Sequence, residues 1–314
     1  MKWKVMVSAP YMIPEIDRFR DWFTEHDIEI EIPNVVERME EKDLLPIIER
    51  YDGVICGDDR FTENVYKAAK KLKVVSKWGT GIDSINKDIA EKYGVMVGNT
   101  PDAFSHPVSD SVLGFMLAFS RNIIGSDRLM KNGEWEKIKG KTLGEQTLGI
   151  IGCGNVGSRV AKKANAFGMK IYACDIRELP KPILEQYNIE QVDLDTLLRE
   201  SDFVSTNCDL NNSSYHILSD DAFKKMKSTA VVINTARGPV VDEQALIRAL
   251  EAGEIRGCGL DVFEFEPLPI DSPLRKMDNV ILSSHNTNSS PRYWEYVHEN
   301  TLENLLIGLE RGGK

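Results

Sequence analysis

The sequence has no long hydrophobic run and contains few cysteines. Its richest apolar stretch, residues 112–119, is far too short to cross a bilayer. The first residues also lack the continuous apolar segment of a secretory signal. The five cysteines show no C-x-x-C spacing, which argues against a metal site and a disulfide framework. We therefore expect no metal and a cytoplasmic location, where thiols stay reduced.

Positive charge is scarce as well. The chain has 39 Lys and Arg residues against 49 Asp and Glu residues, a formal net charge of −10. Because nucleic acids and anionic membranes are recognised through basic surfaces, neither is expected as a main partner. The length of 314 residues, of which 42% are hydrophobic, suffices for about two domains with cores of their own.

The most informative stretch lies between positions 147 and 175. A short apolar run ends at Ile151, and a G-x-G-x-x-G motif follows it directly. In this motif the first glycine permits a tight turn, the second admits a pyrophosphate, and the third lets the next helix pack on the strand. That helix, predicted over 158–168, would point its N-terminus at the phosphates. We predict that the dinucleotide-binding residues are Gly152, Gly154, Asn155, Val156 and Gly157.

A second strand, predicted over 169–174, ends at Asp175. This carboxylate stands 18 positions after Gly157, where the motif requires an acceptor for the adenosine ribose hydroxyls. Because a carboxylate repels a 2′-phosphate, NAD is expected rather than NADP. Arg177 is interpreted as an ordinary loop cation. The alternative is a unit whose glycines serve packing alone, but the full order of strand, turn, helix, strand and aspartate favours a cofactor site.

The rest of the chain alternates apolar strands with helices. Strands are predicted at 4–7, 28–32, 53–56, 74–76 and 95–97, and later at 203–206, 230–234, 257–261 and 280–283. Helices are predicted at 14–24, 39–50, 62–70 and 87–93. Such alternation indicates an α/β protein with helices on both faces of parallel sheets, and the number of strands predicts two doubly wound domains.

Two helices are expected to connect these domains. One follows Pro101 and is predicted over about 102–121. The other, over 290–310, has Pro291 in its first turn and an apolar face that must be buried against another part of the chain. We predict a discontinuous substrate-binding domain of residues 1–100 and 286–314, and a dinucleotide-binding domain of residues 101–285. The polar segment 131–146 fits a subunit-contact arm and a solvated loop equally well.

Three side chains that could carry chemistry follow strands after the glycine motif: Arg237, Glu266 and His285. An arginine offers a planar fork to a substrate carboxylate. A histidine can carry a proton near neutral pH, and a neighbouring carboxylate favours the imidazolium. Taken singly, each has a purely structural explanation, as a strand cap, the start of a loop or a surface histidine. Together, beside a dinucleotide site, they predict an active site.

Four segments make the chain resemble a known family. They are the glycine motif, Ser76-Lys-Trp-Gly-Thr-Gly-Ile-Asp83, Asn234-Thr-Ala-Arg-Gly-Pro-Val-Val-Asp-Glu243 and Leu260-Asp-Val-Phe-Glu-Phe-Glu-Pro267. The chain resembles the D-2-hydroxyacid dehydrogenases, in the branch that contains D-3-phosphoglycerate dehydrogenases. The resemblance implies a Rossmann NAD-binding domain, a flavodoxin-like substrate domain and a homodimer.

The same resemblance implies roles for individual residues. Arg237, Glu266 and His285 match the catalytic positions of the family. Backbone amides at Thr80 and Gly81 match the loop that holds the substrate carboxylate together with the arginine. Ala236 and Asp261 fall at the cofactor. The implied activity is reduction of a small 2-oxo acid to a D-2-hydroxy acid by hydride transfer, and the reverse reaction, with His285 as acid and base.

The sequence also departs from the family pattern. Ser284 precedes the histidine where proline is usual, and the arginine-serine pair of phosphoglycerate dehydrogenases is absent around 56–60. Asp58 and Asp59 would repel a phosphate there, so phosphoglycerate is not expected as substrate. A non-enzymatic alternative is a protein that senses NAD occupancy, as the related C-terminal-binding corepressors do. Turnover of small 2-oxo acids would distinguish the two.

Overall fold

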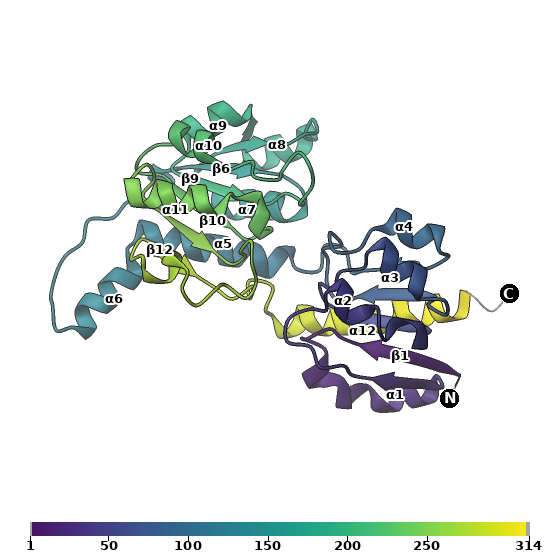
Figure 1. The fold of residues 1–314 in the computed structure, drawn as a ribbon. Coiled ribbons are helices and arrows are strands. Elements are labelled where there is room, and N and C mark those ends of the chain that lie inside the picture. Colours follow the sequence, from purple (N-terminus) through teal and green to yellow (C-terminus); the bar gives the residue numbers. More distant parts are fainter. Residues whose placement is uncertain (1, 312–314) are drawn as a thin grey trace. The chain divides into compact units, whose positions relative to one another are not determined.

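The computed structural model describes residues 2–311 and divides into two compact units (Figure 1). One unit comprises Met1–Phe104 and Ser290–Lys314, and the other comprises Ser105–Ser289. The structure divides the chain after residues 104 and 289. The boundaries predicted from the sequence, after residues 100 and 285, each lie four residues earlier. The assignment of substrate binding to one unit and cofactor binding to the other stays a prediction.

The first unit is built on a parallel five-stranded sheet in the order β2-β1-β3-β4-β5, the flavodoxin-like order. Register is set by pairs such as Val5 with Gly53 and Val54 with Val75. The elements are β1 (Trp3–Val7), η1 (Ile13–Phe19), α1 (Arg20–Glu25), β2 (Ile28–Glu31), α2 (Glu41–Leu44), η2 (Ile48–Arg50), β3 (Gly53–Cys56), α3 (Glu63–Ala68), β4 (Val74–Lys77), α4 (Lys87–Lys92), β5 (Met96–Gly98) and α12 (Pro291–Arg311).

Helix α12 packs against this sheet, although it is separated from the sheet by nearly two hundred residues of chain. A Cβ at Gly308 would lie 2.4 Å from Val74, and a Cβ at Gly53 would lie 2.9 Å from Leu305. The Ser76 hydroxyl donates to the carbonyl of Thr301 at 2.7 Å. Glycines at the contact therefore let the helix and the sheet approach closely, which explains how the C-terminal helix completes the N-terminal core.

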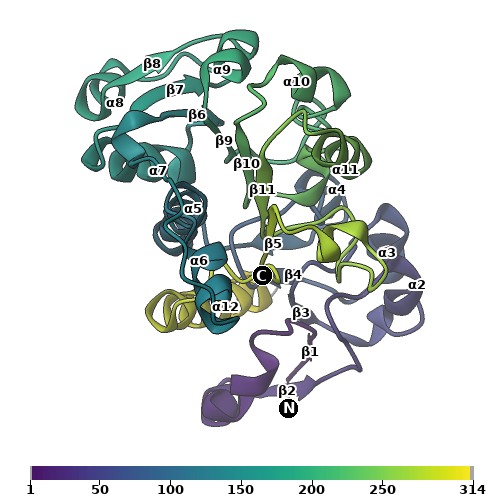
Figure 2. The ribbon, with the colours of Figure 1, turned by 90° about the vertical axis from the view of Figure 1, so that its left-hand side faces the viewer.

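The second unit contains a parallel seven-stranded sheet in the order β12-β11-β10-β9-β6-β7-β8 (Figure 2). This is the doubly wound dinucleotide-binding order with one additional strand. The point at which the order of strands along the chain reverses lies between β6 and β9. The elements are α5 (Ser105–Ser120), α6 (Ile123–Lys131), η3 (Leu143–Glu145), β6 (Thr147–Ile151), α7 (Asn155–Ala166), β7 (Lys170–Cys174), α8 (Lys181–Tyr187), β8 (Ile189–Gln191), α9 (Leu194–Glu200), β9 (Phe203–Thr206), α10 (Asp220–Lys225), β10 (Val231–Asn234), η4 (Gly238–Val240), α11 (Glu243–Ala252), β11 (Gly257–Leu260), η5 (Pro273–Lys276) and β12 (Val280–Leu282).

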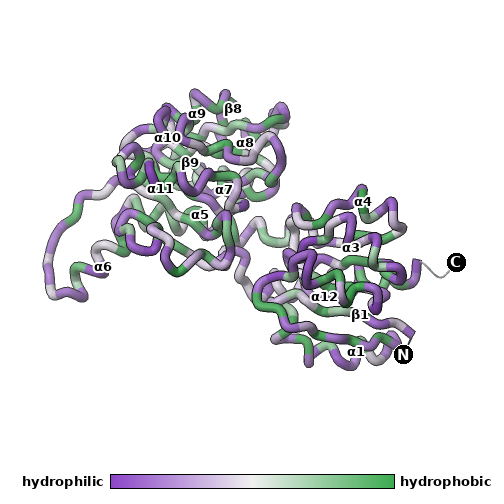
Figure 3. The backbone as a smooth tube through the Cα atoms, viewed as in Figure 1, coloured by the Kyte–Doolittle hydropathy of each residue, from purple (hydrophilic) through white to green (hydrophobic). Residues whose placement is uncertain are grey.

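Apolar cores cover both faces of this second sheet. Along β10, Val231 and Ile233 belong to one cluster of buried side chains, and Val232 between them belongs to the other. Alternate strand residues point to opposite faces, so a strand buried on both sides must be apolar throughout. Figure 3 shows such hydrophobic stretches inside the unit, with hydrophilic stretches along its surface. The predicted class, α/β with two doubly wound parallel sheets, is confirmed.

Several predicted helices were wrong in their bounds. The helix expected at 39–50 is split into α2 and η2, with Pro46 between them, because proline lacks the N–H that would continue the helix. The helix expected at 14–24 begins as the 3-10 helix η1 before it becomes α1. The helix after the glycine motif begins at Asn155 rather than at residue 158, so Gly157 lies inside its first turn.

Among the elements of the second unit that were not predicted are a helix and a short strand. Helix α6 follows α5 after a break at Asn122, whose left-handed backbone (φ 47°) ends the first helix. Strand β8 is only three residues long and carries Glu190 and Gln191, so it lacks an apolar run. None of the helices in the described range has the length and apolarity required to span a bilayer.

Candidate active site

The glycine motif forms a tight turn at the carboxyl end of β6. Gly152 has φ +84°, and a Cβ there would lie 2.7 Å from the Cβ of Cys208. A Cβ at Gly157 would lie 2.2 Å from the Gly152 carbonyl oxygen. Gly154, in contrast, faces open space, with nothing within 4 Å of its Cβ position. Two glycines therefore let the chain turn and pack, and the third leaves a place where a ligand can approach the backbone.

Helix α7 begins directly after this open position. Its N-cap is Gly154, which has no side-chain oxygen to accept from the first N–H groups of the helix. The N-terminus of a twelve-residue helix without a side-chain cap offers unpaired N–H donors and the positive end of the helix dipole. These are the groups that bind a pyrophosphate without a basic side chain.

Asp175 ends β7 beside the same turn. Its Oδ2 accepts from the backbone N–H of Cys153 at 2.8 Å, and its Oδ1 accepts from the N–H of Arg177 at 3.0 Å. Burial by itself raises the pKa of Asp175, but these hydrogen bonds and the nearby guanidinium outweigh it and hold the pKa below its ordinary value. The group is therefore an anion positioned at the glycine turn, as a ribose-binding carboxylate must be.

The neighbouring strand ends supply further polar atoms. The side-chain oxygens Oδ1 of Asn207, after β9, and Oγ1 of Thr235, after β10, are buried and accept no hydrogen bond within the described chain. A buried polar atom without a partner is costly, so such atoms suggest an absent ligand. Together with the open position at Gly154, they fit a dinucleotide along the carboxyl edge of the sheet. The sequence had not singled out Asn207 or Thr235, because neither belongs to a motif.

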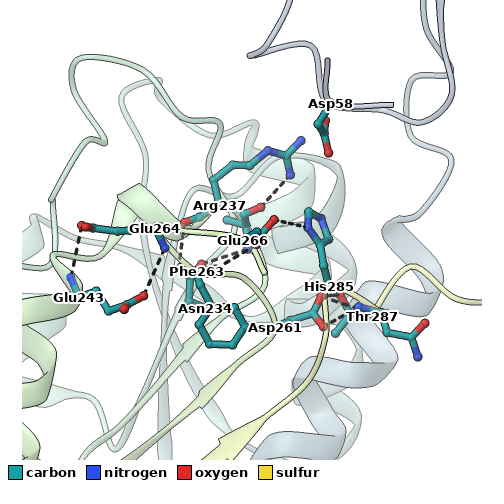
Figure 4. Close-up of polar contacts among 12 residues, drawn as sticks. Asp58, Asn234, Arg237, Glu243, Asp261, Phe263, Glu264, Glu266, His285 and Thr287 are labelled. Carbon is teal, nitrogen blue, oxygen red and sulfur yellow. Dashed lines mark hydrogen bonds and ion pairs between the residues drawn. The ribbon is translucent and has the colours of Figure 1, made fainter. Parts of the chain in front are cut away.

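Glu266 and His285 form a hydrogen-bonded pair at this edge. The distance from His285 Nδ1 to Glu266 Oε2 is 2.9 Å, and both side chains are about four-fifths buried. The second carboxylate oxygen of Glu266 accepts from the N–H of Phe263 at 3.0 Å, which fixes its orientation (Figure 4). His285 has a left-handed backbone, φ 54°, which is unusual for a residue with a side chain. Such local strain is often found at functional sites.

Asp261 holds the segment that carries this histidine. Its carbonyl accepts from the N–H of His285 at 2.8 Å. Its carboxylate accepts from the N–H of Asn286 at 2.8 Å and from the hydroxyl of Thr287 at 2.5 Å. The Asp261 side chain is fully buried. Its predicted contact with the cofactor stays a prediction, whereas its anchoring of the histidine loop is observed.

Arg237 stands in the turn after β10. The buried side chain of Asn234 braces this turn, because its Nδ2 donates to the Arg237 carbonyl at 2.9 Å and its Oδ1 accepts from the N–H of Ala236 at 3.1 Å. Figure 4 shows the guanidinium extending to the side on which Glu266 and His285 lie. Within the second unit the structure thus places all three predicted catalytic residues at the carboxyl edge of one sheet.

The predicted substrate loop lies in the first unit, after β4. Gly79 has φ +123°, and the hydroxyl of Thr80 donates to the carbonyl of Thr100 at 2.9 Å. The side chain of Asn99 donates to the Thr80 carbonyl at 2.7 Å. The loop is therefore held through its oxygens, and the N–H groups of Thr80 and Gly81 donate to no other residue of the described chain. Two such amides suit a carboxylate.

The acidic pair after β3 differs from what its sequence suggested. Asp58 forms an ion pair with the buried ammonium of Lys77 at 2.9 Å. Asp59 is fully buried and accepts from Ser8 and from the N–H of Met39. Both carboxylates are thus held by partners within the first unit. Their repulsion of a phosphate stays a prediction. Lys77 lies in the segment 76–83 that resembles the family, but the sequence did not indicate its ion pair with Asp58.

The burial of Asp59 predicts how the stability of the first unit depends on pH. Burial raises the pKa of Asp59 from 3.8 to about 6, although Ser8 and Met39 donate to its carboxylate. Because the folded pKa exceeds the unfolded one, the stability linked to this group is complete below about pH 4 and is lost as the pH rises through about 6. The loss amounts to roughly 3 kcal/mol, at 1.4 kcal/mol per pH unit.

An Asp59→Asn variant keeps the size of the side chain without the charge. We expect it to gain stability relative to the native chain by up to about 3 kcal/mol between pH 4 and pH 8. The free energy of unfolding is measured by urea titration monitored by tryptophan fluorescence, since four of the five tryptophans lie in the first unit. The exposed Asp21→Asn is the control. Equal differences from the native chain at both pH values would contradict the interpretation.

Comparison with known families identifies the second unit. Residues 113–287 match the family described as D-isomer specific 2-hydroxyacid dehydrogenase, NAD binding domain. The match begins within α5 and ends just beyond His285, so it includes the glycine turn and all three predicted catalytic side chains.

Individual relatives extend this similarity over both units. The chain is 38% identical to a glyoxylate reductase of Thermofilum pendens over 86% of this chain and 81% of the relative. It is 41% identical to a hydroxypyruvate reductase of Thermotoga maritima over 79% and 82% of the two chains. A crystal structure of D-lactate dehydrogenase from Aquifex aeolicus, complexed with NAD and lactic acid, superposes with a TM-score of 0.85 at 25% identity, covering 98% of this chain and 96% of that one.

Proposed function

The chain belongs to the D-isomer specific 2-hydroxyacid dehydrogenase family, and from this premise we propose that it reduces a small 2-oxo acid to the D-2-hydroxy acid and catalyses the reverse oxidation. It is an NAD-dependent oxidoreductase of that family. The observation that carries the proposal is the hydrogen bond between Glu266 and His285, at the sheet edge that also bears the glycine turn.

In the proposed mechanism the substrate carboxylate is bound by the guanidinium of Arg237 and by the amides of Thr80 and Gly81. A cofactor held at the glycine turn would supply a hydride to C2 in its reduced form, NADH, and would accept one in its oxidised form, NAD+. His285 donates a proton to the carbonyl oxygen during reduction and accepts it during oxidation. Since Nδ1 is bonded to Glu266, Nε2 is the nitrogen that carries this proton. Glu266 stabilises the imidazolium and keeps its ring oriented.

NADH oxidation with a panel of glyoxylate, hydroxypyruvate and pyruvate tests the proposal. We expect turnover with at least one of these acids and a D-2-hydroxy acid as product, identified by chiral chromatography. NADPH is assayed in parallel, and the Asp175 carboxylate predicts that it is the poorer donor. Binding of NADH without turnover of any 2-oxo acid would contradict an enzymatic role and favour the NAD-sensing alternative.

We also propose that the enzyme is a homodimer in the cytoplasm, formed through α6 and the segment after it. All residues of α6 are at least partly exposed. The exposed apolar side chains here are Ile123, Ile124, Met130, Trp135 and Ile138, and Trp135 is 81% exposed. Figure 1 shows α6 and this segment extending away from the rest of the second unit. Several exposed apolar side chains in one segment favour a protein partner, and a second copy of the chain fits the family.

A Trp135→Glu variant tests this interface. We expect sedimentation velocity to show a dimer for the native chain and mainly monomer for the variant, because a charge would be buried without a partner. Ile270→Glu is the control, since Ile270 is 86% exposed outside this segment. A variant that sediments like the native dimer would contradict the assignment.

A further inference from the structure

A second pair of histidine and glutamate lies beside the first. His216 Nε2 is 2.6 Å from Glu264 Oε1, and both side chains are largely buried. Glu264 stands two residues before Glu266 in the same loop. This loop therefore carries two carboxylates, one bonded to His285 and the other to His216. The proposed mechanism uses only the first.

Glu264 is also tied to the start of helix α11. The N–H of Glu264 donates to Oε2 of Glu243 at 3.2 Å, and the N–H of Glu243 donates to Oε1 of Glu264 at 3.4 Å (Figure 4). Asp242, the N-cap of α11, has its Oδ2 3.8 Å from Nδ1 of His216. The imidazole thus lies between two carboxylates from different segments.

His216 reaches the segment of Arg237 through the backbone. Its N–H donates to the carbonyl of Pro239 at 2.9 Å, and its φ of 50° places it in the left-handed region. Next to Arg237, a Cβ at Gly238 would lie 1.9 Å from the carbonyl of Phe263. The turn that carries Arg237 and the loop that carries Glu266 are therefore in direct contact, and His216 is bonded to both segments.

A metal ion would fit this cluster poorly. His216, Asp242 and Glu264 have the side chains of metal ligands and lie close enough to share an ion. However, the two carboxylates face different ring nitrogens, Nδ1 and Nε2, and one ion can bind only one nitrogen of a ring. The arrangement is that of an imidazole bridging two acids.

We propose that His216 and Glu264 are a positioning pair, which holds the loop so that Glu266 remains bonded to His285. Both residues act through the proposed catalytic residues and do not contact the reacting atoms. The inference rests on the proposed function for its kinetic consequences. A displacement of about 1 Å in an active site can lower a rate by about 100-fold, so a small relaxation of this loop suffices for a large effect.

The kinetic test compares His216→Leu and Glu264→Met, which break the pair from opposite sides, with His216→Gln, whose amide can still donate to Glu264. We expect the first two to lower kcat roughly 10- to 100-fold, with KM for NADH within about twofold of the native value. We expect His216→Gln to recover most of the rate. Lys225→Ala, which breaks an exposed ion pair with Asp195 in the same unit, is the control and should leave kcat unchanged.

A double-mutant experiment with Glu266 distinguishes a role of His216 in positioning that carboxylate from a general role in stabilising the fold. In a Glu266→Gln background the carboxylate to be positioned is already absent, so His216→Leu should lower kcat less than about threefold. An equal loss in both backgrounds, or a loss confined to KM, would overturn the proposal.

A measurement that does not depend on catalytic activity tests the positioning role separately from the proposed function. The chain has five histidines, so ¹⁵N-histidine labelling gives few imidazole signals, and His285→Gln assigns the one of interest. The signal of His285 Nδ1 should shift in His216→Leu or Glu264→Met and stay unchanged in Lys225→Ala. An unchanged signal in both pair variants would overturn the positioning role, even if the 2-oxo acid panel succeeds. A shifted signal supports it, even if that panel fails.

Discussion

Replacing His285 with alanine is expected to lower kcat for reduction, and for oxidation, by about 10²–10⁴-fold, the usual contribution of a positioned general acid or base. The imidazole is bonded to Glu266 at 2.9 Å and its backbone is fixed by Asp261, so solvent cannot easily replace the lost proton carrier in the same geometry. Stopped-flow measurement of NADH consumption and formation at saturating substrate checks both directions.

The two directions should also respond oppositely to pH. Reduction needs the imidazolium and fades as the pH rises, whereas oxidation needs the neutral ring and fades as the pH falls. Glu266→Gln keeps the shape of the partner without its charge and should slow reduction more than oxidation. His26→Ala, at the C-terminal end of α1 in the first unit, is the control. A His285→Ala variant with native rates in both directions would remove this residue from the mechanism.

The parts of this site that the sequence predicted depend on local chain geometry. Gly152 has a positive φ, and a Cβ at Gly157 would lie 2.2 Å from the Gly152 carbonyl oxygen, so both positions favour glycine. Their spacing directly after an apolar strand located the turn. Glu266 and His285 were expected to meet because parallel strands end at one edge of a sheet. The structure places them within hydrogen-bond distance.

Other features depend on contacts that no local pattern encodes. His216 is hydrogen-bonded to Glu264, which lies 48 positions further along the chain. His216 belongs to no motif, so no local pattern predicted this pair. The start of α7 was placed three residues late, because the helix is capped by Gly154, which has no side-chain oxygen that would mark the start. The sequence did not indicate the burial of Asp59, because its partners Ser8 and Met39 are distant in the chain.

Replacing Arg237 with methionine should lower kcat/KM for a 2-oxo acid by about 10²–10⁴-fold. A bidentate contact between guanidinium and carboxylate comprises two charge-assisted hydrogen bonds of about 1.5–3 kcal/mol each. Their sum, about 3–6 kcal/mol, corresponds to this range at 1.4 kcal/mol per factor of ten. Steady-state kinetics with the best acid of the panel measures the effect, and NADH binding should change less than about twofold.

Lysine at the same position should recover only part of this loss. Its ammonium keeps the charge but lacks the planar fork, and a point charge on a flexible chain cannot match both carboxylate oxygens. The turn itself should persist, because Asn234 braces it through the backbone of Ala236 and Arg237 and not through the guanidinium. Arg248→Met on α11, which breaks an exposed pair with Asp220, is the matched control. Full kcat/KM in Arg237→Met would show that the substrate carboxylate is bound by other groups, whereas full recovery by lysine would show that charge alone suffices.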